Sequence, residues 1–328
     1  MNVSRNSTRF HHSKTEMAVG ATLLSIIMLS AFLGNLLTSM IFLRKPHLRT
    51  TTNISVLFLS ISDILMAVLV MPFSLASLVK GKWISTQEAC TFNAWLLYSL
   101  IGVSLITMTS TAVIRFFCVV KPIFHHQYIK PKIVAVGISI LWLTTSFMFG
   151  GLALLATSER RGYSKKRTFC FLAIRGNIAK VLNYIGLSLV VIAGLLIFLA
   201  YFKVFRFVSR HNQTMASNLQ QGKPSHIEEA RITKTLVIVV LGFVSCWAPA
   251  TIIQVIDIFP RFRMPAFASL IQAVSIFAIS CINPFIYGFT NRRLRREYLE
   301  LLRFMLPLGV RVAPVGGSWK FISRKNRM

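Results

Sequence analysis

The sequence predicts an all-α membrane protein: a bundle of seven transmembrane helices followed by a short amphipathic helix on the membrane surface. Of its 328 residues, 54% are hydrophobic and only 14% are charged, whereas about a quarter of an average soluble domain is charged. A helix needs about 20 mostly apolar residues to cross a bilayer. Such stretches recur at residues 17–43, 53–79, 90–120, 133–156, 178–208, 235–259 and 264–288.

The seven spans divide the chain into four segments. The first 17 residues are polar, and no short apolar run with a small-residue cleavage site precedes the first span, so we expect no removable signal peptide. The expected segments are an extracellular tail at 1–17, the transmembrane domain at 18–288, an amphipathic cytoplasmic helix at 289–306 and a basic cytoplasmic tail at 307–328.

The positions of the charged residues predict how the chain is oriented in the membrane, and they argue against binding to nucleic acid. More of the 37 Lys and Arg residues fall on the face that holds the C-terminus, which favours a cytoplasmic C-terminus and an extracellular N-terminus at the plasma membrane. The glycosylation sequons at Asn2 and Asn6 agree with this orientation. The net charge of +28 is spread over every loop rather than one compact domain. We therefore expect no nucleic-acid binding.

One acidic residue, Asp63, lies in the middle of a span, and the other eight lie in loops or near helix ends. A carboxylate at that depth costs a few kcal/mol, so it must face the bundle interior and hold a proton, a cation or polar partners. If the helices pack in sequence order, Asn35, Ser104 and Asn283 could converge on it. Their oxygens are ligands that a small cation prefers. The alternative is an aspartate with a purely structural hydrogen-bonding role.

Five spans carry short motifs that occur together in one family. They are Gly34-Asn35, Leu59 with Asp63, Trp142, Cys246-Trp247-Ala248-Pro249 and Asn283-Pro284-Phe285-Ile286-Tyr287. In this order, and across residues 18–305, they resemble the motifs of rhodopsin-like (class A) G-protein-coupled receptors. The resemblance implies a receptor rather than an enzyme, with an extracellular ligand and a heterotrimeric G protein as partners.

The resemblance implies an interior sodium site. It assigns Asp63, Ser104 and Asn283 to this site, with Asn35 and Trp247 nearby. A cation beside Asp63 would favour one packing of the bundle over another. No other metal is expected, because no Cys or His cluster has metal-ligand spacing, and no catalytic residues are expected.

The five cysteines fall into two groups. Cys90 opens the third span on the outer face and Cys170 lies in the loop before the fifth, where the compartment is oxidising. A bridge between them would tie this loop over the mouth of the bundle, as the resemblance also implies. We expect Cys118, Cys246 and Cys281 to be free packing residues.

The cytoplasmic end of the third span departs from the family pattern. Ile114-Arg115-Phe116 stands where the family usually has Asp-Arg-Tyr, so the arginine is kept and the neighbouring acid is lost. Glu229 could pair with Arg115 in an inactive state. Because Arg115 lacks the local restraint, we expect higher basal signalling than in a receptor with the full motif. The alternative is that Ile114 marks a receptor with degraded coupling.

Four further residues are predicted to take part in switching. Tyr201 and Tyr287 are the family's expected partners for opening of the cytoplasmic side, although buried tyrosines can simply pack and form hydrogen bonds. Pro249 removes a backbone donor and should kink the sixth span. Pro284 belongs to the seventh-span motif. The fifth span lacks the family's proline near Ala193, so the bulge usual there is not predicted.

The segment after Tyr287 has an apolar stripe at helical spacing and arginines between its members. The stripe consists of Leu294, Tyr298, Leu301, Leu302 and Met305. This pattern predicts an amphipathic helix on the anionic inner leaflet, with membrane lipids as partners and Pro307 ending the helix.

The expected ligand cavity is apolar with a few neutral polar groups. No lysine lies between Lys234 and Lys320, and Phe277 stands where an opsin has its retinal lysine, which excludes bound retinal. Leu97 stands where amine receptors usually have a carboxylate. A small neutral or lipophilic ligand would suit this lining, unless its residues only pack between helices. The predicted lining is Asn93, Leu97, Tyr98, Ile101, Trp247, Thr251, Gln254 and Phe277.

Other readings remain open. The loop before the fifth span is rich in Lys and Arg, between Arg160 and Arg167, and could attract an anionic ligand or simply be a solvated surface. A ligand-poor or constitutively active receptor that acts through heteromers is a second possibility. A transporter would need inverted repeats and several charges inside the membrane, and a channel would need polar rings along a pore. Residues 115–122 are loosely similar to melatonin-receptor-like and related orphan receptors.

Overall fold

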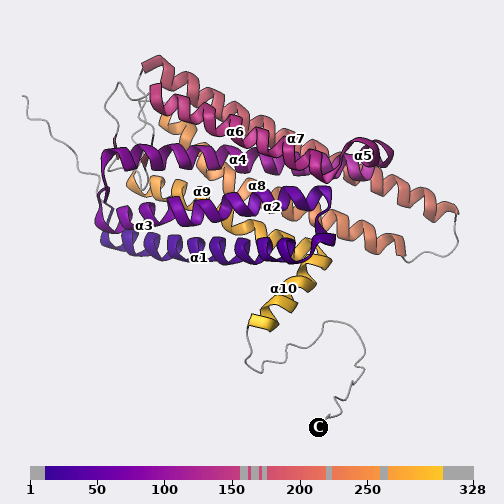
Figure 1. Cartoon of the computed structure of the whole chain (residues 1–328). Coiled ribbons are helices and arrows are strands. Elements are labelled where there is room, and N and C mark those ends of the chain that lie inside the picture. Colours follow the sequence, from indigo (N-terminus) through magenta and orange to yellow (C-terminus); the bar gives the residue numbers. More distant parts are fainter. Residues whose placement is uncertain are drawn as a thin grey trace, which may run out of the picture.

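The computed structural model describes residues 12–155, 162–163, 170–171, 176–218, 224–258 and 265–305. Within these ranges, seven helices are long and apolar enough to cross a membrane. They lie side by side in one bundle, and a shorter helix leaves the bundle at an angle near the C-terminus (Figure 1). The predicted all-α bundle of seven transmembrane helices is confirmed.

The described elements follow the predicted order of spans. In chain order they are α1 (Lys14–Arg44), η1 (Pro46–Leu48), α2 (Thr51–Leu65), η2 (Met66–Val70), α3 (Met71–Lys80), α4 (Gln87–Val120), α5 (Pro122–Tyr128), α6 (Pro131–Leu155), β1 (Gly162–Tyr163), β2 (Cys170–Phe171), α7 (Gly176–Asn218), α8 (Pro224–Ile258), α9 (Ala266–Thr290) and α10 (Arg292–Met305). The second span is the continuous unit of α2, η2 and α3.

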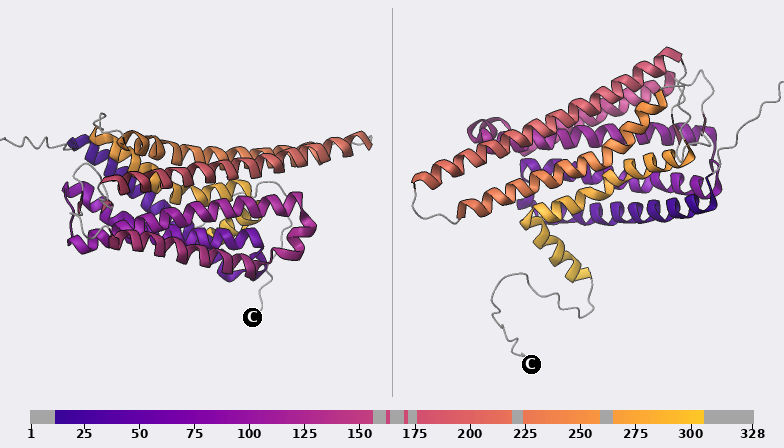
Figure 2. Two further views of the ribbon diagram at one scale, coloured as in Figure 1. Left: turned by 90° about the horizontal axis from the view of Figure 1, so that it is seen from above. Right: turned by 180° about the vertical axis from the view of Figure 1, so that it is seen from behind.

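The helices and the predicted spans differ most at the ends of the fifth and sixth spans. The predicted spans were 178–208 and 235–259, whereas α7 continues to Asn218 and α8 begins at Pro224. The two helices project together beyond the rest of the bundle (Figure 2). Hydropathy detects only the apolar part of a helix, so it does not detect a polar extension outside the hydrocarbon layer.

Three spans begin at hydroxyl caps. Ser13 and Glu16 form a reciprocal capping box at the start of α1, with the Ser13 amide donating to Glu16 at 2.8 Å and the Glu16 amide donating to Ser13 Oγ at 3.1 Å. Thr50 and Thr86 accept hydrogen bonds from the first turns of α2 and α4. These caps satisfy backbone donors that a helix start otherwise leaves free.

The second span contains a π-helical turn that was not predicted. The turn, Met66–Val70, lies just before Pro72, which has no backbone N–H to donate. The Asn93 amide of α4 donates to the Leu69 carbonyl at 3.1 Å. A side chain from a neighbouring helix thus satisfies a carbonyl at the irregular turn.

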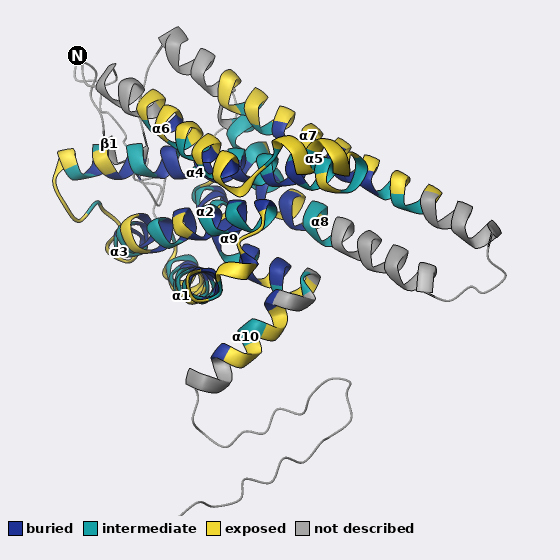
Figure 3. Cartoon of the chain, turned by 45° about the vertical axis from the view of Figure 1, so that its right-hand side comes forward, coloured by how far each residue is buried: buried dark blue, intermediate teal, exposed yellow. Residues whose placement is uncertain are grey.

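The residues between the helices are buried, whereas many apolar residues on the outside of the bundle are exposed. Figure 3 shows buried residues along the facing sides of α1, α2, α4 and α9, with exposed positions on the outer sides of α6 and α7. Leu143 and Phe147 on α6 are 71% and 83% exposed. Apolar side chains with this exposure fit a lipid environment rather than water.

The predicted bridge between Cys90 and Cys170 is present. Cys170 also lies in a two-stranded antiparallel hairpin, in which Tyr163 is opposite Cys170. Both cysteines are buried beside Ala94. Cys118, Cys246 and Cys281 are free, as predicted, but Cys118 is exposed rather than packed in the interior.

The apolar side of α10 packs against the bundle more closely than a purely surface-bound helix would. Leu294 and Leu301 are 1% and 9% exposed and join a cluster with Ile41 and Phe42 of α1 and Tyr287 of α9. The side chains of Leu302 and Met305 lie outside the described ones. Contact of α10 with the membrane surface stays a prediction.

A glycine allows α1 to approach α9 closely. A Cβ atom on Gly34 would lie 2.9 Å from Cγ and 3.0 Å from Cβ of Pro284, and the proline ring has little freedom to move. We expect Gly34→Ala to lower stability by about 1–3 kcal/mol, the usual cost of overpacking. Thermal unfolding of purified protein in detergent measures this change.

Gly137→Ala is the matched control, because a Cβ atom there would meet nothing within 4 Å. It should leave the melting temperature nearly unchanged. An equal effect of the two substitutions would show that close packing at Gly34 is not the cause.

Candidate functional site

The carboxyl group of Asp63 is buried at the centre of the bundle, as predicted. Asp63 of α2 is fully buried, and the Asn283 amide of α9 donates to its Oδ2 atom at 2.8 Å. The second oxygen, Oδ1, is buried and has no hydrogen-bond partner in the described part of the chain. The site therefore has one satisfied oxygen and one that could accept a proton donor or a cation.

Asn35 and Ser104, also assigned to the sodium site, form hydrogen bonds with groups other than this pair. Asn35 donates to the carbonyls of Ala31, at 2.8 Å, and Ser280, at 2.9 Å, so it ties α1 to α9. Ser104 of α4 lies with its Oγ atom 3.4 Å from that of Ser62, the neighbour of Asp63.

Two serines at the site were missed by sequence reasoning. Ser280 lies one helical turn before Asn283, and its hydroxyl lies beside the Asp63 carboxyl. Ser62 lies next to Asp63 and faces Ser104. The spacing of three residues between Ser280 and Asn283 could have revealed the first, because residues i and i+3 share a helix face.

Trp247 lies in an apolar cluster rather than among the polar groups. Its ring stacks on Phe243 with centroids 5.8 Å apart, and the cluster includes Leu105, Ala193 and Ile279. The indole Nε1 is buried, without a hydrogen-bond partner among the described residues. Trp247 lies on α8 two residues before Pro249, where α8 continues through the proline.

The residues predicted to line a ligand cavity separate into apolar and amide groups. Leu97 and Phe277 are each 1% exposed and share one cluster, against which Ile101 packs. Gln254 of α8 accepts a hydrogen bond from Gln272 of α9 at 3.1 Å.

The remaining lining residues differ in their surroundings. Asn93 is buried and bonded to the Leu69 carbonyl. Tyr98 and Thr251 are half-buried. Sequence reasoning missed Gln272, which is 5% exposed. An amide in an apolar span is the signal that could have indicated it, because such groups need a partner in the membrane.

Arg115 is bonded to a tyrosine at the opposite end of the bundle from the disulfide. Its Nη1 atom donates to the hydroxyl of Tyr201 on α7 at 3.1 Å. Tyr287 of α9 is buried and lies close enough to interact with the guanidinium group. The structure thus brings the predicted arginine and both predicted tyrosines together. The proposed pairing with Glu229 involves a side chain outside the described ones.

Ile114 has a packing role where the family usually has an acid. It is 8% exposed and forms a cluster with Val134 and Ile138 of α6. Ile54, Phe58, Ile129 and Trp142 pack against the same cluster. Phe116, on the other side of Arg115, has Lys203 of α7 at 5.8 Å from its ring centre. The two sequence neighbours of Arg115 are therefore Ile114, which is aliphatic, and Phe116, which is aromatic.

Two sets of predicted features fall outside the described residues. They are the sequons at Asn2 and Asn6, and the basic residues between Arg160 and Arg167. These stay predictions.

The comparisons with known proteins point to one family. The model of the family described as 7 transmembrane receptor (rhodopsin family) matches residues 34–287. The chain is 24% identical over 322 residues to 5-hydroxytryptamine receptor 4 of Cavia porcellus, covering 90% of this chain and 82% of the relative. It is 24% identical over 300 residues to trace amine-associated receptor 365 of Petromyzon marinus, covering 88% and 81%. The loose similarity to melatonin-like receptors is not confirmed.

The Asp63–Asn283 pair predicts an asymmetric response to substitution. Asn283→Ala leaves a buried carboxyl group without its amide donor, and we expect a loss of stability of about 1–3 kcal/mol. Exchange of the two residues, Asp63→Asn with Asn283→Asp, retains an amide facing a carboxyl and should recover much of this loss. Thermal unfolding of the variants in nanodiscs measures both effects.

An Asn283→Ala variant as stable as the original protein would mean that another group, or water, satisfies the carboxyl. Ser269→Ala is a suitable control, because the Ser269 hydroxyl donates to the Ala266 carbonyl of its own helix at 2.8 Å.

Proposed function

Because the chain belongs to the rhodopsin family of seven-transmembrane receptors, we propose that it transmits the binding of an extracellular ligand to heterotrimeric G proteins. It is a multi-pass protein of the plasma membrane. The observation that carries the proposal is the meeting of Arg115, Tyr201 and Tyr287 at one end of the bundle. A positive group whose partners lie on two other spans is suited to respond when those spans separate.

The disulfide supports an extracellular position for the opposite end. Disulfides form in oxidising compartments, so the end with Cys90 and Cys170 faces outward in this proposal. The start of α1 at Lys14 lies at the same end as these cysteines, because one pair of spans separates it from them. Arg115, at the other end, then faces the cytoplasm.

Raised basal activity follows from the surroundings of Arg115. The acid that would restrain it is replaced by Ile114, which is buried in an apolar cluster. Its observed partner is instead Tyr201, the partner that the family resemblance associates with opening of the cytoplasmic side. The balance between closed and open states should therefore lie closer to open than in a receptor with the acid.

The apolar Leu97 and the amide pair of Gln254 and Gln272 support a neutral or lipophilic ligand. The two relatives are named for 5-hydroxytryptamine and trace amines, and an ammonium group needs a carboxylate partner when it is buried. Leu97 is apolar and 1% exposed. Gln254 and Gln272 offer neutral hydrogen-bonding groups instead. An anionic ligand attracted by the basic loop, or a receptor that signals without a ligand through heteromers, is the alternative.

Ligand-free nucleotide exchange tests the role of the tyrosine. Tyr201→Phe removes one hydrogen bond to a charged group, so we expect basal exchange on a reconstituted G protein to fall about fivefold or more, since about 1 kcal/mol is a factor of five. Tyr184→Phe is the matched control, because Tyr184 is exposed on the outside of the same helix.

Ile114→Asp separates raised basal activity from degraded coupling. If the missing acid raises activity, the substitution should lower ligand-free exchange below that of the original protein. If the original protein is no more active than a mock preparation and Ile114→Asp restores coupling to an added ligand, coupling is degraded and the proposal of raised activity is wrong.

A sodium effect tests the interior site. The buried Oδ1 atom of Asp63, and the side-chain oxygens of Asn283 and Ser104, are hard ligands of the kind that Na⁺ takes. We expect basal exchange to be several-fold lower in sodium chloride than in the chloride of a bulky organic cation at equal ionic strength. Asp63→Asn should remove the difference, and a difference that survives this substitution would contradict the site.

A further inference from the structure

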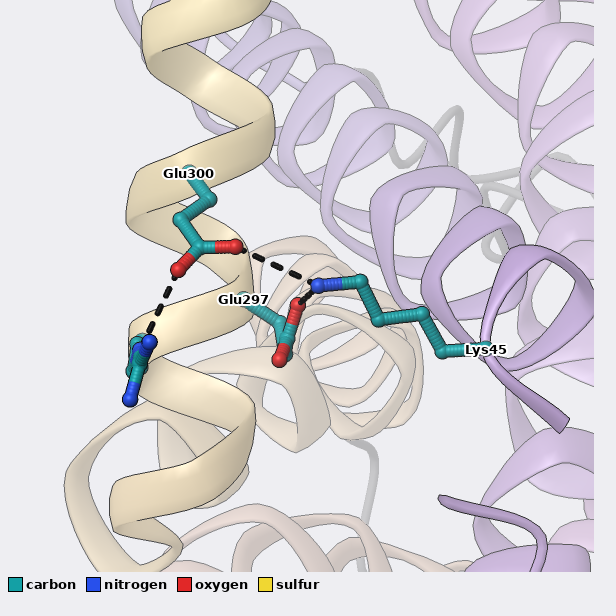
Figure 4. Close-up of polar contacts among 4 residues, drawn as sticks. Lys45, Glu297 and Glu300 are labelled. Carbon is teal, nitrogen blue, oxygen red and sulfur yellow. Dashed lines mark hydrogen bonds and ion pairs between the residues drawn. The ribbon is translucent and has the colours of Figure 1, made fainter. Parts of the chain in front are cut away.

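A cluster of charged side chains joins the end of α1 to α10. Lys45, the residue after α1, pairs with both Glu297 and Glu300 of α10, and its Nζ atom is 3.2 Å from Glu300 Oε2. Figure 4 shows the lysine reaching across the gap between the two helices to the two carboxylates. The second oxygen of Glu300 accepts a hydrogen bond from Arg296 Nε at 3.1 Å. Glu300 is therefore shared between Lys45 and Arg296.

The face of α10 that bears Glu297 also carries its apolar contacts. Tyr298, next to Glu297, shares a hydrogen bond of 2.6 Å with Thr38 of α1, which is fully buried. A Cβ atom on Gly288 of α9 would lie 3.9 Å from the Tyr298 ring. Burial raises the pKa of Tyr298 to about 12, so its hydroxyl stays neutral in this contact.

The two acidic residues of α10 contact Lys45 at the end of α1, whereas Arg296 is exposed. Glu297 and Glu300 are the acidic residues in the sequence of this helix, and both reach Lys45. The side chain of Glu297 is only 14% exposed, whereas that of Arg296 is 81% exposed. A half-buried carboxylate needs a partner because it has lost part of its hydration. Pairing has the expected effects: contact with Glu297 raises the pKa of Lys45, and contact with Arg296 and then Lys45 lowers the pKa of Glu300.

The start of α10 is attached to the bundle independently of Lys45. The Asn291 side chain accepts a hydrogen bond from the Leu294 amide at 3.2 Å and caps the helix. Leu294 is 1% exposed in the cluster formed with α1 and α9. Beyond Leu294, the described contacts of α10 are Tyr298, Leu301 and the charged cluster. The first turn and the rest of the helix thus have separate attachments.

We propose that Lys45, Glu297 and Glu300 form an ionic latch that holds the later turns of α10 against α1, and that α10 swings away from the bundle when the latch opens. Its first turn stays attached through Leu294 during this movement. Single exposed ion pairs contribute little because water and salt screen them. Here one lysine serves two carboxylates and one of them is half-buried, so removal of the lysine leaves a poorly hydrated charge.

The latch also determines which side of α10 faces outward. With Glu297 turned to α1, Arg295 and Arg296 are exposed. Arg296 bonds to Glu300 Oε1 while Lys45 bonds to Oε2, so the two cations share the charge of this carboxylate. The local balance of charge, rather than a ligand in the bundle, then controls the position of α10. This proposal does not depend on which ligand or G protein the receptor uses.

Distances between two spin labels test the latch directly. We would place the labels at Leu43→Cys on α1 and Leu299→Cys on α10, which are 61% and 41% exposed, in a Cys118→Ser background of the full chain. The protein is reconstituted in nanodiscs of zwitterionic lipid. The original latch should give one narrow distance distribution. Lys45→Glu, and separately Glu297→Lys with Glu300→Lys, should each add a second population at longer distance.

Reversing the charges on both helices at once shows whether charge pairing, rather than damage to the surface, holds α10 in place. The combination of Lys45→Glu, Glu297→Lys and Glu300→Lys restores opposite charges across the gap and should recover the narrow distribution. Arg44→Glu is the matched control: it makes the same charge change one residue earlier, at an exposed side chain, and should leave the distances unchanged. At 1 M salt, where the screening length is about 3 Å, the original protein should partly open.

Two results would overturn the latch. One is a Lys45→Glu distribution identical to that of the original protein. The other is a reversed combination that stays as broad as the single changes, which would show that general damage to the surface, rather than loss of charge pairing, moves α10.

Discussion

A carboxyl group inside an apolar bundle is the constraint on which the centre of this protein depends. Asp63 cannot reach water, and a buried charge without partners would cost several kcal/mol. Helices α2 and α9 therefore lie side by side, and the Asn283 side chain donates a hydrogen bond to Asp63 at 2.8 Å. Ser280, one turn earlier on α9, also receives the amide of Asn35 at its carbonyl. One polar layer thus links three spans that also meet through apolar, non-directional contacts.

Close approach of the helices makes this layer possible. The short reach of Asn35 to the Ser280 carbonyl, 2.9 Å, requires α1 and α9 to lie near each other, and Gly34 provides the room beside Pro284. In a membrane, lipid tails are as apolar as the side chains, so helices gain little from apolar burial alone. Small residues and interhelical hydrogen bonds then determine which faces meet. The polar layer and the glycine contact support each other in this way.

The sequence predicted the features that depend on composition and on local pattern. Seven apolar stretches, a charge at mid-span and paired outer cysteines each have a direct physical reason, and the structure contains all three. It did not predict contacts that depend on how helices rotate against each other. Ser62 and Gln272 became visible only in the structure, because a lone serine or glutamine in a span has no partner that the sequence specifies. The π-helical turn before Pro72 was missed for the same reason: a proline predicts a disturbance, but the neighbouring Asn93 decides how it is satisfied.

The end of the bundle that holds Arg115 shows that the loss of one motif residue does not remove the rest of the site. The side chain at position 114 packs against Val134 and Ile138, so an aspartate there would find no polar partner within the cluster and would depend on the neighbouring Arg115. Ile114 suits these surroundings, and it joins α4 to α6 through apolar contact instead. Arg115 is then free of a neighbouring acid and takes the hydroxyl of Tyr201 as its partner. A phenol compensates a guanidinium charge less than a carboxylate does, so this contact can be exchanged more easily. The substitution therefore changes the strength of the restraint on Arg115, while the arginine and both tyrosines remain in place to respond to movement of α7 and α9.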